Sequence, residues 1–230
     1  MKQWLFIGFM LILLPLASAQ GRFHPGDVVP EPYLKVNGYE AFFTISHVSE
    51  TLRESMEGVS YKSDKYVEWE TLRYLKVLHR DADGNAVIGE LVCNMLIAND
   101  LMEIFKALFE AGYPIEKMRL IDHYGGDDDA SMRDNNTSCF NQRQITQGGT
   151  ISKHSYGFAI DINPRYNPYY MMRLGKAIVK PESSTDYLDR SADSPYMIAK
   201  GDLCYRLFKQ HGFRWGGDWI RGKDYQHFEK

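Results

Sequence analysis

Residues 71–95 contain the pattern that most restricts the fold of this chain. The apolar runs 71–80 and 86–95 lie on either side of the turn-forming sequence Asp83-Gly84-Asn85. Two strand-like runs joined by such a turn predict a β-hairpin with a slightly long loop. The fold therefore has to accommodate an antiparallel pair of strands near the middle of the chain.

A helix is expected directly after this hairpin, over residues 97–111. Its apolar residues recur at i, i+3, i+4 and i+7, as Leu101, Ile104, Phe105 and Leu108. Gly112 follows the last of these turns and ends the helix. The run 118–124 reads as a further strand, and residues 125–150 are polar with little periodicity. A polar segment of that length within a compact domain is usually functional or disordered.

The remaining elements are shorter. We expect a helix starting at the N-cap Ser46 and running to Glu57, and a second helix over 202–211. A strand is expected at 159–163, residues 163–194 are expected to be irregular, and the segments FRW and YQHFEK are expected to form closing strands. Helices and strands in mixed order with hairpin connections predict an α+β fold, with a mainly antiparallel central sheet flanked by helices.

The first residues are interpreted as a targeting segment and not as part of the fold. Lys2 precedes an apolar run over 4–16, and Ala17-Ser18-Ala19 fits a signal-peptidase site. We therefore expect a signal peptide over 1–19, export to the periplasm or the extracellular space, and no stable membrane insertion after cleavage. Residues 20–69 are expected to form a lead-in with a helix packed on the domain, and residues 70–230 the catalytic core.

Composition excludes some functions. The 230 residues carry a formal net charge of −3, without the basic clusters typical of nucleic-acid-binding proteins, so no nucleic-acid partner is expected. The three cysteines, Cys93, Cys139 and Cys204, are too few for a disulfide scaffold. An exported chain would permit one bridge among them, and the sequence leaves that pairing open. We expect a monomer.

The stretch SKHSYGFAID, residues 152–161, suggests a metal site. In a straight strand His154 and Asp161 would point to opposite faces, because side chains alternate along a strand. A turn at Tyr156-Gly157 would bring both side chains to one point, and glycine has the backbone freedom for such a turn. The pair by itself is weak support, because most such spacings arise by chance.

The C-terminal sequence KDYQHFEK strengthens this interpretation. His227 adds a second imidazole to His154 and Asp161, and together they form a set of two nitrogens and one oxygen. Zinc with three protein ligands keeps a fourth position for water, which is the pattern of catalytic sites. Asp224, three residues before His227, would then be free to act as a general base. One zinc ion per chain is the expected cofactor.

Three further residues are candidates for substrate contacts. Arg143 is a permanently charged donor suited to a carbonyl oxygen or a carboxylate. Ser152 lies two residues before His154 and would hydrogen-bond substrate, and Trp219 would line the cleft. Structural alternatives exist for each: a salt bridge for Arg143, a turn for Ser152 and core packing for Trp219. His123, next to acidic residues, is interpreted as part of a solvated loop and not as a second metal ligand.

These motifs resemble those of the D-alanyl-D-alanine carboxypeptidase (VanY-like) zinc metallopeptidases. SKHSYGFAID resembles their S-x-H-x-x-G-x-A-x-D signature, and WGGDWIRGKDYQHFE resembles their closing motif with D-x-x-H. The likeness extends over roughly residues 70–229, and relatives of this family include phage L-alanyl-D-glutamate endopeptidases. The paired motifs are specific, whereas either motif alone would not be.

The resemblance implies roles for particular residues. It implies zinc held by His154, Asp161 and His227, Asp224 as general base, and Arg143 as an oxyanion and substrate contact. It also implies the α+β fold of Hedgehog-type domains and hydrolysis of peptidoglycan stem peptides, as a D-Ala-D-Ala carboxypeptidase or an L-Ala-D-Glu-type endopeptidase. Several branches have Glu at the position of Asp224; the shorter aspartate would have to approach the water more closely, which is interpreted as a mark of the endopeptidase-like branch. The sequence does not decide which bond is cut. The alternative is a zinc-containing domain that binds cell-wall peptides without cleaving them.

Overall fold

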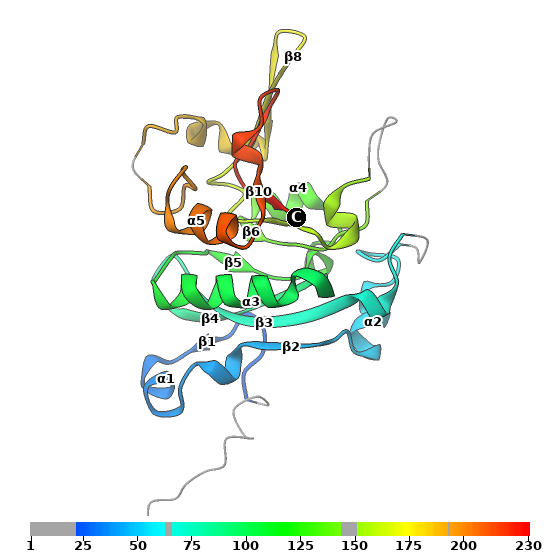
Figure 1. The fold of residues 1–230 in the computed structure, drawn as a ribbon, viewed down its shortest axis with the longest axis vertical. Coiled ribbons are helices and arrows are strands. Elements are labelled where there is room, and N and C mark those ends of the chain that lie inside the picture. Colours follow the sequence, from blue (N-terminus) through cyan, green and yellow to red (C-terminus); the bar gives the residue numbers. More distant parts are fainter. Residues whose placement is uncertain (1–21, 63–65, 144–150, 193) are drawn as a thin grey trace, which may run out of the picture.

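A computed structural model describes residues 22–62, 66–143, 151–192 and 194–230 (Figure 1). The predicted signal peptide over residues 1–19 lies outside these ranges. Helices and antiparallel sheets are mixed along the chain, so the predicted α+β class is confirmed. No helix in the described ranges has both the length and the apolar character needed to cross a membrane.

The largest sheet has four antiparallel strands in the order β1-β4-β3-β2. Its strands are β1 (Val28–Val29), β2 (Thr44–His47), β3 (Leu72–Arg80) and β4 (Ala86–Asn94). The predicted hairpin is confirmed, because β3 pairs with β4 along its whole length, from Leu72 opposite Asn94 to Arg80 opposite Ala86. All nine residues of β4 are buried, as expected for a strand with neighbours on both edges and other elements on both faces.

The helix α3 (Met95–Glu110) packs on one face of this sheet (Figure 1). At the N-terminus of α3, the Asn94 side chain accepts a hydrogen bond from the Leu96 amide. Gly112 follows the C-terminus of α3 with a φ of 69°. The predicted helix over 97–111 is thereby confirmed, with its four expected apolar residues buried. This helix joins the first sheet to the rest of the core.

The second sheet contains β7 (Ala159–Asp161), β12 (His227–Glu229) and β10 (Arg214–Trp215), with β12 in the middle. The expected closing strands are thereby confirmed, and the helix α5 (Leu203–Gln210) covers them. Phe208 of α5 stacks on Phe228 of β12 with 4.2 Å between ring centroids. Phe228 is fully buried, so β12 is fixed in the core while its neighbour His227 faces the other side.

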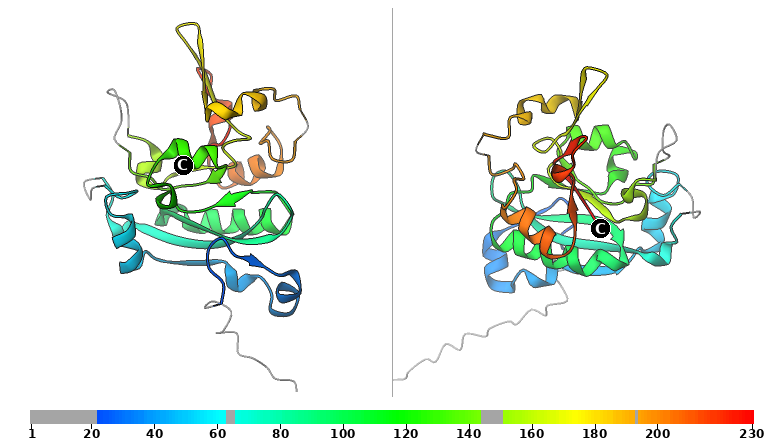
Figure 2. Two further views of the ribbon diagram at one scale, coloured as in Figure 1. Left: turned by 180° about the vertical axis from the view of Figure 1, so that it is seen from behind. Right: turned by 45° about the horizontal axis from the view of Figure 1, so that its top comes forward.

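The expectation of an irregular segment over 163–194 is wrong. The chain forms a hairpin of β8 (Tyr169–Arg173) and β9 (Lys176–Lys180), followed by the 3-10 helix η6 (Glu182–Leu188). The strand β11 (Lys223–Asp224) pairs with β8 and completes a third sheet. This hairpin projects from the end of the molecule opposite α1 (Glu31–Asn37), as Figures 1 and 2 show. Prolines around the segment obscured its strand pattern.

Two other predictions near the N-terminal half need correction. The helix α2 (Glu50–Met56) is capped by Ser49, whose hydroxyl accepts from the Leu52 amide, whereas Ser46 lies in β2. The expected strand over 118–124 is reduced to β5 (Lys117–Met118), and residues 121–124 form the 3-10 helix η4 (Ile121–Tyr124). The polar segment after it contains the helix α4 (Asp128–Arg133) and β6 (Asn136–Thr137), which pairs parallel to β5. Short 3-10 helices η2 (Glu40–Phe42) and η3 (Trp69–Thr71) complete this part.

Candidate metal centre

His154 lies in a short 3-10 helix, η5 (Lys153–Tyr156), that leads into β7. The hydroxyl of Ser152 accepts a hydrogen bond from the His154 amide and caps the start of η5. Gly157 ends it with a φ of 71°, in the left-handed region where glycine carries no Cβ penalty. The turn predicted at Tyr156-Gly157 is therefore present, and it reverses the direction of the chain between His154 and Asp161.

The other two candidate ligands come from neighbouring strands. In the antiparallel pair of β7 and β12, Asp161 lies directly opposite His227. Opposed residues in such a pair point to the same face of the sheet, so their side chains meet. Two segments that are 66 positions apart in sequence thus place a carboxylate and an imidazole side by side.

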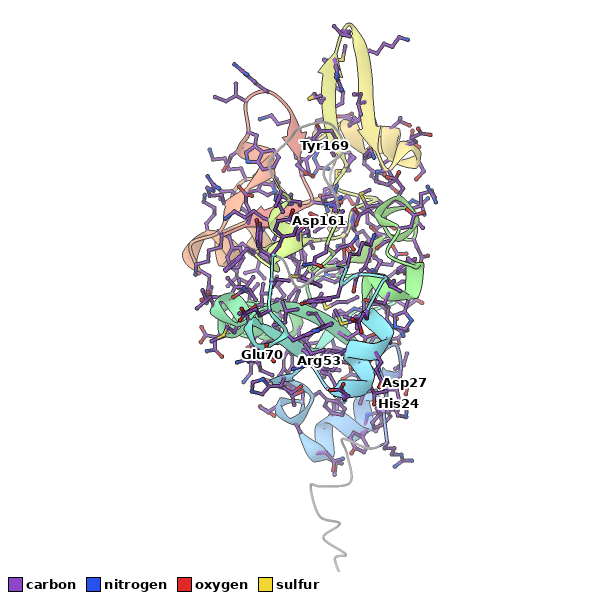
Figure 3. All side chains as sticks on the ribbon, turned by 90° about the vertical axis from the view of Figure 1, so that its right-hand side faces the viewer. His24, Asp27, Arg53, Glu70, Asp161 and Tyr169 are labelled. Carbon is purple, nitrogen blue, oxygen red and sulfur yellow. The ribbon has the colours of Figure 1, made fainter. Side chains whose placement is uncertain are left out.

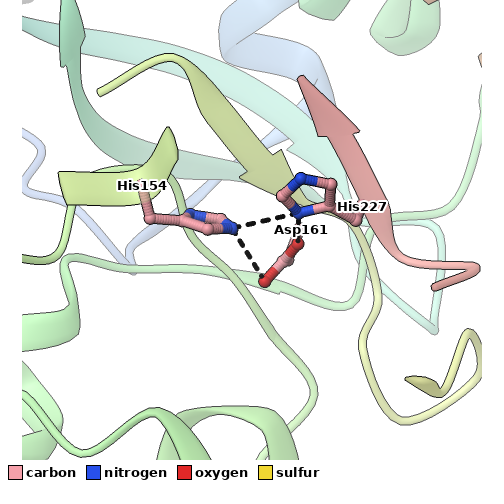
Figure 4. A group of neighbouring side chains, drawn as sticks. All are labelled: His154, Asp161 and His227. Atoms are coloured by element: carbon pink, nitrogen blue, oxygen red, sulfur yellow. Dashed lines mark hydrogen bonds and ion pairs between the residues drawn. The ribbon is translucent and has the colours of Figure 1, made fainter. Parts of the chain in front are cut away.

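The three side chains converge at one point (Figure 4). His154 Nε2 is 3.2 Å from His227 Nδ1 and 3.3 Å from Asp161 Oδ2, and His227 Nδ1 is 3.0 Å from Asp161 Oδ1. Tetrahedral zinc with bonds of about 2.0–2.1 Å separates its ligand atoms by about 3.3 Å. The spacing of these donors is therefore close to that around a tetrahedral zinc ion. Within the described residues they are the only group of three or more His, Cys, Asp or Glu ligands that gathers this closely.

Neighbouring groups orient the two imidazoles. His154 Nδ1 donates to the Cys139 carbonyl oxygen at 2.6 Å, which leaves the lone pair of Nε2 directed at the site. The other ring nitrogen of His227, Nε2, lies 3.6 Å from Glu229 Oε2. Both imidazoles therefore have a second partner that sets which ring nitrogen faces the centre, as metal-binding histidines usually do.

The electrostatics of the site favour a cation. Burial by itself would raise the pKa of Asp161, but the facing imidazoles of His154 and His227 hold that pKa well below its usual range. Burial also opposes a charge on His227, yet its hydrogen bonds to Asp161 and Glu229 raise its pKa to about 10. The carboxylates around the imidazoles thus stabilise positive charge at this position. Two imidazole nitrogens and one carboxylate are a donor set that suits zinc.

Asp224 lies beside these three residues and lines the same cleft. Its Oδ1 atom is buried, and no residue in the described ranges gives it a hydrogen-bond partner. Burial raises the pKa of Asp224 to about 6, because the charged form is poorly solvated there. A carboxylate with a pKa close to neutrality and a free acceptor atom is suited to proton transfer. Gly216 makes this position possible, because an added Cβ there would meet the Asp224 side chain and backbone.

The cleft has a volume of about 530 Å³ and contains every residue that the sequence analysis assigned to the site. Arg143 lines it, but its guanidinium pairs with Asp128 of α4, so the salt bridge considered as an alternative is present. Ser152 lines the cleft while also capping η5, which is the structural role considered for it. Trp219 is 37% exposed, and its ring centroid is 5.4 Å from that of His227.

The sequence analysis missed several residues of the cleft wall. Tyr169 and Lys180 come from opposite strands of the β8–β9 hairpin, where they pair in register. In Figure 3, Tyr169 and Asp161 both lie in the half of the molecule that carries this hairpin. Gln226 and Arg214 also line the cleft. The two short apolar runs YYMM and AIV on either side of Gly175 were the signal that could have identified the hairpin.

The structure also shows the surroundings of the three cysteines and of His123. The three cysteines are buried free thiols, so the bridge that an exported chain would permit is absent. The His123 side chain is exposed, as expected, but its Nε2 also lies 2.9 Å from Oε1 of the buried Glu90, which also pairs with Arg119. These three residues form a hydrogen-bonded cluster around the buried Glu90 of β4.

Comparison with known proteins agrees with the geometry. Residues 146–230 match the family model described as D-alanyl-D-alanine carboxypeptidase, and this range includes His154, Asp161, Asp224 and His227. The resemblance inferred from the sequence is confirmed over this range, and the match supports a peptidase. For the part of the chain before residue 146 the resemblance stays a prediction. No protein of curated function and no solved structure was found that matches the chain.

Proposed function

We propose that this protein is a zinc-dependent peptidase that hydrolyses peptide bonds in peptidoglycan stem peptides, as a D-Ala-D-Ala carboxypeptidase or an L-Ala-D-Glu-type endopeptidase. The observation that carries the proposal is the convergence of His154, Asp161 and His227 at 3.0–3.3 Å in a cleft that also contains Asp224. The family match of residues 146–230 supports the choice of substrate class.

His154, Asp161 and His227 would hold the zinc ion. When bound, zinc acts as a Lewis acid that polarises a carbonyl oxygen and lowers the pKa of water to about 7. The protein contributes a donor set with the right spacing, partners that orient both imidazoles, and a buried setting that keeps the ligands in place.

Asp224 would act as the general base. Its unpartnered Oδ1 accepts the proton of the water that attacks the scissile carbonyl carbon, and the protonated carboxyl then donates it to the leaving amine nitrogen. The C–N bond breaks, a C–O bond forms, and Asp224 returns to its starting state. A pKa of about 6 leaves most of this residue ionised at neutral pH and able to accept the proton.

Arg143 would stabilise the negative charge that develops on the carbonyl oxygen, or bind a substrate carboxylate. Its guanidinium lines the cleft and is kept in position by Asp128. Ser152 and Trp219 would contact the rest of the peptide from the cleft wall. In this proposal the protein acts as an exported monomer, and residues 1–19 serve as its signal peptide.

The test uses purified protein, stoichiometric zinc and peptidoglycan stem peptides, with Asp224→Asn as the informative variant. We expect Asp224→Asn to keep one zinc per chain and to lose about 10²- to 10⁴-fold in kcat, because the general base is removed while the ligands remain. Asp218→Asn is the matched control, since Asp218 is exposed in the neighbouring 3-10 helix η7 (Gly216–Asp218) and does not line the cleft. Mass spectrometry of the products distinguishes removal of a terminal D-Ala from an internal cut.

Two outcomes would contradict the proposal. If the wild-type protein binds one zinc and leaves every stem peptide intact, the protein is a zinc-containing binding domain. If Asp224→Asn cleaves as fast as the wild type, Asp224 is not the base, and the assignment of the three metal ligands is then judged by zinc binding alone.

A further inference from the structure

The tip of the β8–β9 hairpin has an unusual residue for a tight turn. Leu174 and Gly175 connect the strands with φ angles of 51° and 74°, so both are in the left-handed region. Asn, Asp and Gly are the residues favoured at such positions, and a leucine there carries backbone strain. The Leu174 side chain is 96% exposed, so no packing within the described structure offsets that strain.

A second loop with an exposed aliphatic residue lies beside this hairpin. Residues 219–222 lead into β11, which pairs with β8, and an added Cβ on Gly222 would lie 3.6 Å from the Met171 Cβ. Ile220 in this loop is 97% exposed. Residues 171–176 and 219–222 are named the projecting end here, because both segments extend from the same end of the molecule (Figures 1 and 2).

The projecting end is positively charged. Arg173, Lys176 and Arg221 are exposed and form no ion pair with any residue in the described ranges. The segments 169–181 and 219–223 contain no Asp or Glu. The exposed charged residues within the projecting end itself, Arg173, Lys176 and Arg221, are therefore all positive, and the nearest acidic residues in sequence, Glu182, Asp218 and Asp224, flank its segments.

We infer that the projecting end docks on the surface of an anionic lipid bilayer. Leu174 and Ile220 would enter the boundary between headgroups and acyl chains, while the three cations would contact anionic headgroups. Glycan sites are usually built on aromatic faces, whereas the two most exposed apolar side chains of the projecting end, Leu174 and Ile220, are aliphatic, and its aromatic residue Trp219 lines the cleft. Two copies meeting through these tips would bring like charges together, which is unfavourable.

Docking would also orient the cleft. The strands that carry the projecting end are β8 and β11, whose bases contribute Tyr169 and Asp224 to the cleft. A bilayer bound at the tips would therefore be connected to the cleft through these two strands. This inference goes beyond the proposed function and does not depend on it, because binding can be measured without any activity.

The experiment is co-sedimentation of the full-length protein with vesicles of phosphatidylcholine alone or mixed with phosphatidylglycerol. We expect binding to the anionic vesicles, weakened by salt. Leu174→Asn should reduce the partition coefficient about tenfold or more, because the side chain no longer enters the apolar layer. Asparagine suits the left-handed turn, so this variant should be at least as stable as the wild type in urea unfolding. Arg173→Gln and Lys176→Gln should each weaken binding about fivefold.

Val36→Asn is the matched control, since Val36 is 84% exposed on α1 at the opposite end of the molecule. We expect it to leave vesicle binding unchanged. Equal binding of wild type and Leu174→Asn would overturn the inference. Binding to purified peptidoglycan without binding to vesicles would also overturn it, as would dimerisation that Leu174→Asn abolishes in the absence of lipid.

Discussion

Replacing Gly157 by alanine should disturb the metal centre through the backbone alone. Gly157 ends η5 with φ 71° and ψ 23°, a conformation that costs an L-residue about 1–2 kcal/mol. An added Cβ would also lie 2.6 Å from the Asn94 nitrogen and 3.0 Å from the Cys93 carbonyl carbon. These are backbone atoms of the central strand β4, so they cannot move aside cheaply, and the overpacking should cost about 1–3 kcal/mol more.

The chain contains a matched control for this substitution. Gly125 ends the 3-10 helix η4 with φ 64° and ψ 23°, and nothing lies within 4 Å of its added Cβ. Gly125→Ala should therefore lower the free energy of unfolding by the conformational cost alone, about 1–2 kcal/mol. Gly157→Ala should lower it by about 2–5 kcal/mol, the sum of the conformational and steric costs.

Urea unfolding of both variants in the presence of a chelator measures this difference, and zinc titration measures its effect on the site. Gly157→Ala should bind zinc more weakly, because His154 lies three residues earlier in the same turn and would move away from Asp161 and His227. Gly125→Ala should bind zinc like the wild type. The reasoning is refuted if the two variants lose the same stability, since the close approach to β4 would then have no energetic consequence.

Three further predictions concern stability. Ser49→Ala should lower the free energy of unfolding by about 1 kcal/mol, because it removes the cap of α2. Ser46→Ala in β2 should change the free energy of unfolding by no more than about 0.5 kcal/mol. Urea unfolding of both variants checks the corrected cap position. Burial lowers the pKa of His79 to about 4 from its ordinary 6.5, so the unfolded chain takes up the proton first as the pH falls. The free energy of unfolding should therefore drop by about 3 kcal/mol between pH 6.5 and 4. His79→Gln should remove that part of the pH dependence. If the free energy of unfolding of His79→Gln falls with pH as steeply as that of the wild type, this explanation is wrong. Protein without zinc should be less stable by about 2.7 kcal/mol than protein in free zinc at a hundred times the Kd, because zinc binds only the folded state. Thermal unfolding with and without a chelator measures this difference. Equal unfolding midpoints would argue against a metal bound to the folded state.

The local elements were readable from the sequence because their signals lie within a few residues of one another. Apolar periodicity predicted α3, and a turn-forming sequence between two apolar runs predicted the pairing of β3 with β4. The same local chemistry predicted that Gly157 would turn the chain between His154 and Asp161. Local signals failed where competing residues were close together, as with Ser46 and Ser49, or where a turn lacked its usual residues, as at Leu174.

The sequence by itself determined which side chains were available as metal ligands, through two short motifs at 152–161 and 224–227. Only the tertiary structure decided that they meet, because the contact depends on the register of β7 against β12, which places Asp161 opposite His227. It also decided that the β8–β9 hairpin brings Tyr169 to the cleft and that Asp128 holds Arg143. Strand pairing over such separations depends on how the whole core packs, which no short window of sequence encodes.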